Sequence, residues 1–320
     1  EMESTKINGK EIRRLKENVR FVKPGKVILT DNAVQYISGD VLHLNGNTMM
    51  INGMDTLTCD SMVYWSKLDS GYAMGNVHYV QPEKDRRLTT DIFHYWQTEG
   101  YRGSSFIAKG YTRVIENDQL ITANEIRYDD DLQIMILSVN ASVEDPTRGI
   151  FGDEMEIHYA DSLVEMIRVE KNAFAYNDLH LRVEENGTYQ KFRDEMTSKK
   201  MTAYFQDDNI SQLELMNMAT TLYHVVDDSL LAGENEASGD TISINFQEGE
   251  IKRLQVRGGA LGEFKPEGKN TKIDTTVYYG GEYLDYHIDE ELTFLSQGAF
   301  MEYQDTKLSA GEILVNWETN

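Results

Sequence analysis

Apolar and polar residues alternate with a period of two along most of the chain. The alternation is clearest just before an aromatic residue that recurs at intervals of about 30 to 45 positions. Two positions before each of these aromatic anchors the residue is apolar in eight of nine cases, and the residue between them is mostly polar. Such alternation predicts β-strands with one buried face. The anchors are Tyr36, Tyr64, Tyr95, Tyr128, Tyr159, Tyr204, Phe246, Tyr286 and Trp317.

Turn-forming residues follow every anchor except the last, as in Ser38-Gly39-Asp40. A second strand-like segment then reaches a corner that contains Gly or Asn, for example Gly75-Asn76 or Asn140. Gly and Asn suit such corners because both tolerate positive φ. The chain is therefore expected to contain about nine repeats, each with two or three short strands and hardly any helix.

The spacing of the anchors lengthens in the second half of the chain. We interpret the extra residues as polar surface loops inserted near 184–195, 227–239 and 264–275. No shift in composition divides the sequence, so we expect a single continuous array over residues 1–320.

Composition narrows the classes of function. The 320 residues are 40% hydrophobic and carry a net charge of −23, which indicates a folded, acidic and soluble protein. Nucleic-acid binding needs a basic footprint, and the sequence has no strong one. Residues 1–24 carry seven basic and four acidic side chains, which could favour end-to-end association, although a solvated strand edge is the simpler interpretation.

The candidate chemistry is sparse. Cys59 is the only cysteine, which excludes an internal disulfide and a cysteine-based zinc site. The seven histidines show no metal-ligand spacing, acidic clusters such as Asp129-Asp130-Asp131 fall in expected turns, and no catalytic fingerprint is present. We therefore predict no enzymatic activity, no metal and no cofactor. No apolar run approaches the ~18 residues of a membrane-spanning helix, and no secretion leader follows Glu1.

Several segments carry a resemblance to a known family. They are Glu17-Asn18-Val19-Arg20-Phe21, the stretch from Asp55 to Tyr64, Gly75-Asn76-Val77-His78-Tyr79 and Ala237-Ser238-Gly239-Asp240-Thr241-Ile242. With these motifs in phase, the sequence resembles the OstA-like family of lipopolysaccharide-transport proteins over nearly its whole length. The resemblance implies a β-jellyroll (β-taco) solenoid of about nine stacked coils, with an apolar groove for the acyl chains of lipopolysaccharide or a related lipid. It also implies a periplasmic location, with association with the outer membrane as a further expectation.

The residues expected to line this groove are the anchors and the apolar side chains in phase with them. They are Val34, Tyr36, Met62, Tyr64, Val77, Tyr79, Phe93, Tyr95, Ile126, Tyr128, Ala141, Val143, Ile157, Tyr159, Ile244 and Phe246. Residues one position away, such as Gln35 and Arg127, are expected to point outward. Phosphate contacts would come from rim cations, for which the candidates are Lys84, Arg86, Arg87, Arg13, Arg14 and Lys16.

Other interpretations of the same pattern remain open. The tyrosines could fill a closed β-helix to which a ligand has no entry. The chain could also be a parallel β-helix that binds or cleaves carbohydrate, or a β-scaffold with a purely structural role. Strand-like patterns run from Val19 to Trp317 without a capping helix. We therefore expect pairing of exposed strand edges with other jellyroll proteins or with a second copy of the chain.

Overall fold

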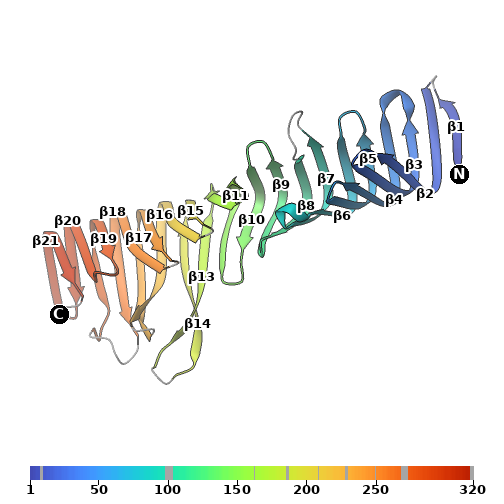
Figure 1. The fold of residues 1–320 in the computed structure, drawn as a ribbon. Coiled ribbons are helices and arrows are strands. Elements are labelled where there is room, and N and C mark those ends of the chain that lie inside the picture. Colours follow the sequence, from blue (N-terminus) through green and yellow to red (C-terminus); the bar gives the residue numbers. More distant parts are fainter. Residues whose placement is uncertain are drawn as a thin grey trace. The chain divides into compact units, whose positions relative to one another are not determined.

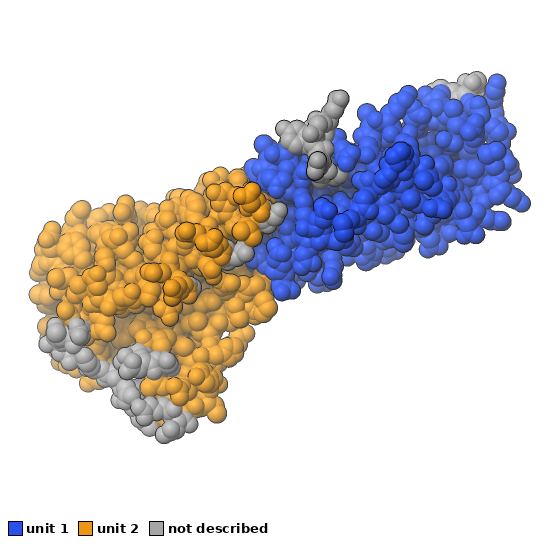
Figure 2. Space-filling view, in the orientation of Figure 1, with its two compact units in different colours: residues 1–143 blue, residues 144–320 orange. Residues whose placement is uncertain are grey.

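Antiparallel β-strands make up nearly all of the computed structural model (Figure 1). It describes residues 1–7, 10–97, 104–161, 163–184, 187–207, 209–227, 230–248, 250–267 and 273–317. These residues contain 21 strands, two short 3-10 helices and no α-helix, so the all-β prediction is confirmed. The chain divides into two compact units, unit 1 (Glu1–Val143) and unit 2 (Glu144–Asn320) (Figure 2). The expected single continuous array stays a prediction.

The elements of unit 1 are β1 (Met2–Ile7), β2 (Lys10–Lys23), β3 (Lys26–Tyr36), η1 (Ile37–Gly39), β4 (Val41–Asn52), β5 (Asp55–Trp65), β6 (Ser70–Gln81), η2 (Pro82–Lys84), β7 (Arg86–Gln97), β8 (Ser104–Glu116), β9 (Gln119–Asp129) and β10 (Ile134–Glu144), the last ending one residue past the boundary. From β1 to β9 each strand pairs antiparallel with the next in sequence, and β10 pairs with β9. Unit 1 is therefore a meander.

Each strand from β2 to β8 is interrupted near its middle by a corner. The pairing skips two residues there, for example between Leu29 and Asn32 on β3. Such bulges bend a strand. We call the half of each strand that carries an aromatic anchor, or pairs with one, arm 1, and the other half arm 2. On β3, arm 1 is Asn32–Tyr36 and arm 2 is Lys26–Leu29.

Two kinds of corner alternate along the meander. On β3, β5 and β7 the corner ends in an aspartate, as at Asp60, whereas on β4, β6 and β8 it contains Gly or Asn at positive φ, as at Gly75 and Asn76. The two kinds contact each other, since Asn76 Nδ2 donates to Asp60 Oδ2 at 2.9 Å. The same bond joins Asn47 to Asp31 at 2.8 Å. Side-chain hydrogen bonds therefore tie adjacent corners together across the sheet.

The elements of unit 2 are β11 (Arg148–Ala160), β12 (Leu163–Val169), β13 (Ala173–Arg182), β14 (Tyr189–Ser198), β15 (Lys200–Gln206), β16 (Asn209–Asp227), β17 (Leu230–Gln247), β18 (Glu250–Pro266), β19 (Val277–His287), β20 (Leu292–Tyr303) and β21 (Thr306–Asn316). β12 and β13 are the two arms of one bent strand, because they pair with different halves of β11. β15 and β14 are likewise the two arms of the next strand, since both pair with β16.

The predicted inserted loops correspond largely to longer strands. β16 and β17 contain 19 and 18 residues, against 11 in β3. Residues 189–195 belong to β14, 230–239 to β17 and 264–266 to β18, so the loop prediction is wrong for these residues. The extra residues lengthen arm 2, where further ladder hydrogen bonds satisfy the backbone. The predicted loop positions 185, 186, 228, 229 and 268–272 lie outside the described residues.

The sequence repeat is a pair of strands and not a winding coil. The anchors fall on β3, β5, β7, β9, β11, β15, β17 and β19, and Trp317 follows β21. Each repeat thus advances the sheet by two strand spacings, about 9.6 Å. The parallel β-helix alternative is wrong, because the described pairs are antiparallel apart from a single bridge between Arg182 and Leu230.

The corner contacts predict a difference between two glycines with matched backbone angles. Gly75 has φ +75° and a Cβ there would lie 2.4 Å from Asp60 Oδ2, whereas Gly25 has φ +74° with no atom within 4 Å. We expect Gly25→Ala to lower the free energy of unfolding by about 1 kcal/mol and Gly75→Ala by about 3 kcal/mol, because only the second adds a clash. Urea unfolding of the two variants measures this. Equal losses would show that the corner is not tightly packed.

Candidate functional site

The space between the two arms of unit 1 is lined by two continuous apolar rows. In arm 1 the pairing joins Ala33, Leu44, Met62, Ala73, Phe93, Ala108 and Ile126 from β3 to β9. In arm 2 it joins Ile28, Met50, Leu57, Tyr79, Leu88, Val114 and Ile121 over the same strands. All these side chains are buried. The rows arise because the strands alternate within each arm; on β3 the buried phase shifts by one residue at the corner, from Ile28 to Ala33, whereas on β4 Leu44 and Met50 keep the period of two.

The two rows face and contact each other. The rings of Tyr79 in arm 2 and Phe93 in arm 1 lie 5.0 Å apart, and the Tyr95 hydroxyl of arm 1 lies 3.1 Å from Met50 Sδ of arm 2. A cavity of about 10 Å³ beside Leu57 has room for one water at most. The interior is therefore filled by the protein's own side chains in this conformation.

The open side of the interior, opposite the corners, is what we call the mouth, and ionic contacts bridge it. Lys26 at the tip of arm 2 contacts Asp69 at the tip of arm 1, and Asp69 also accepts from the Tyr64 hydroxyl at 2.7 Å. Lys23 Nζ donates to the Ser66 carbonyl at 3.2 Å. Lys26 is only 6% exposed and Asp69 is 33% exposed, so this first latch is shielded from water on the lysine side only.

A second latch crosses the mouth farther along the meander. Lys84 Nζ, after β6 in arm 2, lies 2.8 Å from Asp130 Oδ1 and 3.0 Å from the Tyr128 hydroxyl, both at the tip of arm 1. Arg86 is buried, stacks 4.4 Å from the centre of the Tyr128 ring and forms a two-bond pair with Glu116 at 3.0 and 3.1 Å. Cations of arm 2 and acceptors of arm 1 thus hold the tips together.

Burial controls the ionisation of the interior groups. It raises the pKa of Tyr79 and Tyr95 well above the ordinary range, so both stay neutral at physiological pH. It also raises the pKa of Cys59 to about 12, which leaves an unreactive thiol. For Asp69, burial opposes ionisation, but hydrogen bonds from Lys26 and Tyr64 outweigh it and the pKa lies below its ordinary value.

Unit 2 has a similar interior that also contains buried polar groups. An apolar row in arm 1 joins Leu215, Ile242, Val256, Leu284, Leu295 and Ile313. In arm 2, Asn235 is buried and its amide donates to the Tyr279 hydroxyl at 2.7 Å. The arms meet where the rings of Tyr279 and Trp317 lie 6.5 Å apart, edge to face.

Most of the predicted groove residues are buried in these interiors. They are Met62, Tyr64, Val77, Tyr79, Phe93, Tyr95, Ile126, Tyr128, Ala141, Val143, Ile157, Tyr159 and Ile244. Phe246 is half-buried after a bulge in β17. The inward orientation predicted for Val34 and Tyr36 is wrong. Ala33 is 3% exposed and belongs to the inner row, so Val34 and Tyr36 lie on the outer face and Gln35 on the inner one.

The rim cations separate in the structure. Lys84 and Arg86 lie at the mouth, as described above. Arg14 and Lys16 pair with Val34 and Asn32 on the outer face of arm 1, away from the mouth. Sequence reasoning missed Lys26, although it lies at the start of a strand, next to a turn, where tip residues are expected.

Comparison with known proteins gives no identification. The sequence matches no family model and no curated protein. In the described residues, no group of three or more His, Cys, Asp or Glu side chains is arranged to hold a metal ion, and no helix is long and apolar enough to cross a membrane.

The latch at Asp69 predicts a dependence of stability on pH. A lowered pKa in the folded state adds stability above the unfolded value near pH 4, and this is lost as the pH falls through the folded pKa. We expect Asp69→Asn to lower the free energy of unfolding by about 1 kcal/mol at pH 7, and the difference from the unmodified chain to shrink below pH 4. Urea unfolding of both proteins between pH 3 and pH 7 measures this difference in the free energy of unfolding. A difference independent of pH would contradict the ion pair.

Proposed function

We propose that this chain is a non-enzymatic lipid carrier, a β-jellyroll (β-taco) of the OstA-like type that shields the acyl chains of lipopolysaccharide between its two arms. One observation carries the proposal. Two continuous apolar rows face each other across seven strands of unit 1, and the ionic contacts described between the arms lie at one side only. An extended hydrocarbon chain is the ligand that fits such a surface, because it needs no hydrogen-bonding partner along its length.

Loading a lipid requires the arms to separate at the mouth. Each methylene moved from water into the interior contributes about 0.8 kcal/mol, so a 12-carbon chain gains on the order of 9 kcal/mol before ordering costs. The latch between Lys26 and Asp69 is partly exposed and contributes about 1 kcal/mol. Acyl chains would also replace the contacts that the two rows make with each other. The burial of lipid therefore favours an open, loaded state over the filled interior.

The mouth also suits an anionic head group. Lipid phosphates would lie where the acyl chains leave the interior, next to Lys26, Lys84 and Arg86. These cations contact the carboxylates of Asp69, Asp130 and Glu116 in the closed state. On loading, a phosphate would take the place of a carboxylate as the partner of a cation, so the positive charges stay paired.

The ends of the sheet support the proposed partners. In the described residues, β1 pairs only with β2 and β21 only with β20, which leaves one edge of each strand free. Free edges pair readily with further strands. We propose that these edges join other OstA-like jellyroll proteins or a second copy of the chain, and so bridge toward the outer membrane within the periplasm.

A cross-link across the mouth tests whether loading needs the arms to open. The variant Lys23→Cys/Ser66→Cys can be joined across the mouth by a short bis-maleimide with a cleavable disulfide spacer. We expect the cross-linked protein to capture about tenfold less lipopolysaccharide than the same variant without the cross-link, because only the open state binds. Reduction of the spacer should restore capture, and Cys59 is too buried to react. The control is Asp40→Cys/Ser66→Cys, whose positions both lie in arm 1 turns. Equal capture by the two cross-linked proteins would refute the proposal.

Photo-crosslinking tests where the lipid lies. Benzoylphenylalanine replacing Phe93 or Ile157 should form covalent adducts with lipopolysaccharide, because both positions lie in the interiors. The same group at His78 or Arg113, on the exposed outer face of arm 2, should give few. Immunoblotting for lipopolysaccharide on the purified protein measures the adducts. Adducts confined to the outer positions would favour a scaffold with a surface lipid over a carrier.

A further inference from the structure

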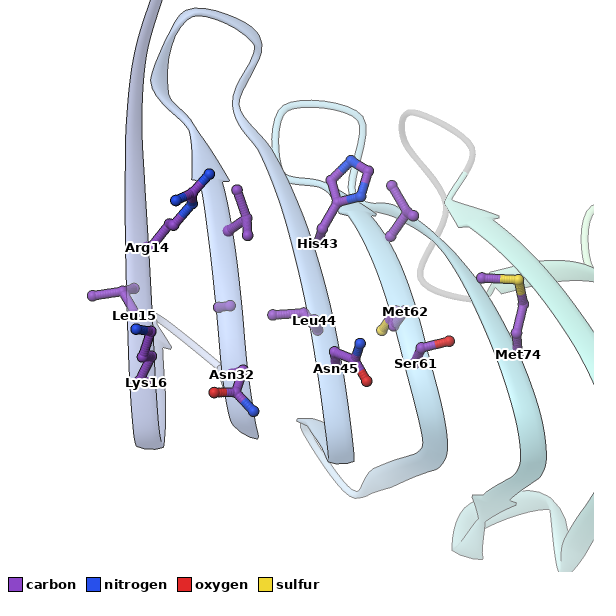
Figure 3. A pocket seen from close by; sticks show the side chains of 13 residues that line it. Arg14, Leu15, Lys16, Asn32, His43, Leu44, Asn45, Ser61, Met62 and Met74 are labelled. Carbon is purple, nitrogen blue, oxygen red and sulfur yellow. The ribbon is translucent and has the colours of Figure 1, made fainter. Parts of the chain in front are cut away.

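The outer face of arm 1 in unit 1 carries a trough of about 340 Å³ that is separate from the interior (Figure 3). It crosses β2 to β6, a distance of about 19 Å at the usual strand spacing. Leu15 and Leu44 lie on the opposite side of the strands from Arg14 and His43 in this view. The trough therefore lies between two outward rows of side chains, and the inner row contributes its floor.

One wall of the trough consists mainly of side chains that can donate or accept hydrogen bonds. It joins Lys16, Asn32, Asn45 and Ser61 in cross-strand register and ends at Met74. The amides of Asn32 and Asn45 and the hydroxyl of Ser61 make no side-chain hydrogen bond to any residue that the structure describes. These groups are thus free to bind a polar ligand.

The opposite wall is apolar and aromatic apart from Arg14. It joins Arg14, Val34, His43 and Val63, and the His43 ring packs 5.1 Å from the ring of Tyr36. Arg14 and Lys16, on the two walls, place two exposed cations at the β2 end, where Glu3 is the cross-strand partner of Arg14 and lies 3.5 Å from Lys16 Nζ. An elongated ligand with polar edges, apolar ring faces and an acidic group at one end would complement this arrangement.

Aromatic residues continue the same face beyond the trough. Tyr72 and His94 lie 6.0 Å apart and His94 and Trp96 5.3 Å apart, all half-buried on the outer side, and Trp65 lies beside them in phase. Two of the three tryptophans in the chain are therefore on this face. Half-buried rings with a wet edge are typical of surfaces that bind amphipathic ligands.

The fold does not require this set of side chains on the outer face of arm 1. The equivalent outward row of unit 2 runs through Glu214, Ser243, Gln255 and Asp285 in cross-strand register and continues to Phe294 and Leu314. The first four side chains are polar or acidic, and Asp285 is already bound by Arg253 at 2.8 Å. The amide of Gln255 is already engaged, because it donates to the Tyr283 hydroxyl at 2.6 Å and to Asp285 at 3.2 Å, whereas the amides of Asn32 and Asn45 in unit 1 make no side-chain hydrogen bond to a described residue.

We propose that the outer face of arm 1 in unit 1 binds an acidic oligosaccharide, namely the sugar portion of the glycolipid whose acyl chains lie in the interior. This rests on the proposed function. Sugar rings have apolar faces for Tyr36 and Trp65 and hydroxyl edges for Asn32 and Asn45. Trp65 directly follows Tyr64 of the first latch, so the face begins at the rim from which a head group leaves the interior. Charge complementarity assigns the acidic end of the saccharide to the cations on β2.

The experiment uses an oligosaccharide without acyl chains, the core saccharide released from lipopolysaccharide by mild acid. In a Trp317→Phe background, only Trp65 and Trp96 report on binding by fluorescence. We expect saturable binding that weakens about tenfold in Arg14→Gln/Lys16→Gln and in Trp65→Ala, the effect of losing one aromatic or ionic contact. The matched control is Arg257→Gln/Tyr283→Ala on the outer face of unit 2. We expect this variant to bind the saccharide as well as the background protein does. Arg14→Gln/Lys16→Gln replaces exposed side chains, so this variant should keep the native fold, which circular dichroism checks.

The outcomes separate this site from the interior. The protein cross-linked across the mouth should still bind the saccharide, because the trough lies outside. Absence of saturable binding, or equal binding by the variants and the control, would overturn the proposal. A fluorescence change with phosphatidylglycerol vesicles but not with the saccharide would overturn it in favour of a membrane surface. Saccharide binding without capture of whole lipopolysaccharide would refute the lipid carrier and assign the trough to a free glycan.

Discussion

The bend in the middle of each strand is the constraint on which the rest of the structure depends. A sheet with alternating side chains has one apolar face, which must be covered. Here the sheet covers that face with itself, since the strands from β2 to β8 turn at their corners and the two arms pack against each other. Aspartate on one strand and asparagine or glycine on the next make this turn possible, and their hydrogen bonds hold neighbouring corners in line. Without the corners, both apolar rows would be exposed to water.

The same arrangement would let a filled interior open for the lipid that we propose as its ligand. The two arms are joined by backbone at the corner, whereas at the mouth they meet through side chains such as Lys26 and Asp69. Separation of the tips would break few polar contacts and would expose apolar surface that a hydrocarbon chain covers again. The corner side is therefore held by covalent backbone, whereas only side-chain contacts hold the mouth side.

Periodicity was enough to predict the strands and much of the interior. Tyr64, Tyr95 and Tyr128 face inward as expected, because each ends an alternating run. The prediction for Val34 and Tyr36 is wrong because the first repeat is displaced by one residue, and a one-residue shift moves every side chain of a strand to the other face. Contacts across the mouth, such as that of Lys84 with Asp130, join residues 46 positions apart, and no local pattern specifies them. The outer trough depends on cross-strand register, which a single sequence does not reveal.

The alternation of two corner types restricts how such an array could change its length during evolution. Loss or gain of one strand would bring two corners of the same type together, either two aspartates or two residues at positive φ, and it would reverse the chain direction for everything downstream. Duplication or deletion of a whole hairpin preserves the alternation. Growth in hairpin steps would explain why the aromatic anchors occur on every second strand, and it would let an ancestral gene lengthen the apolar interior without redesigning it.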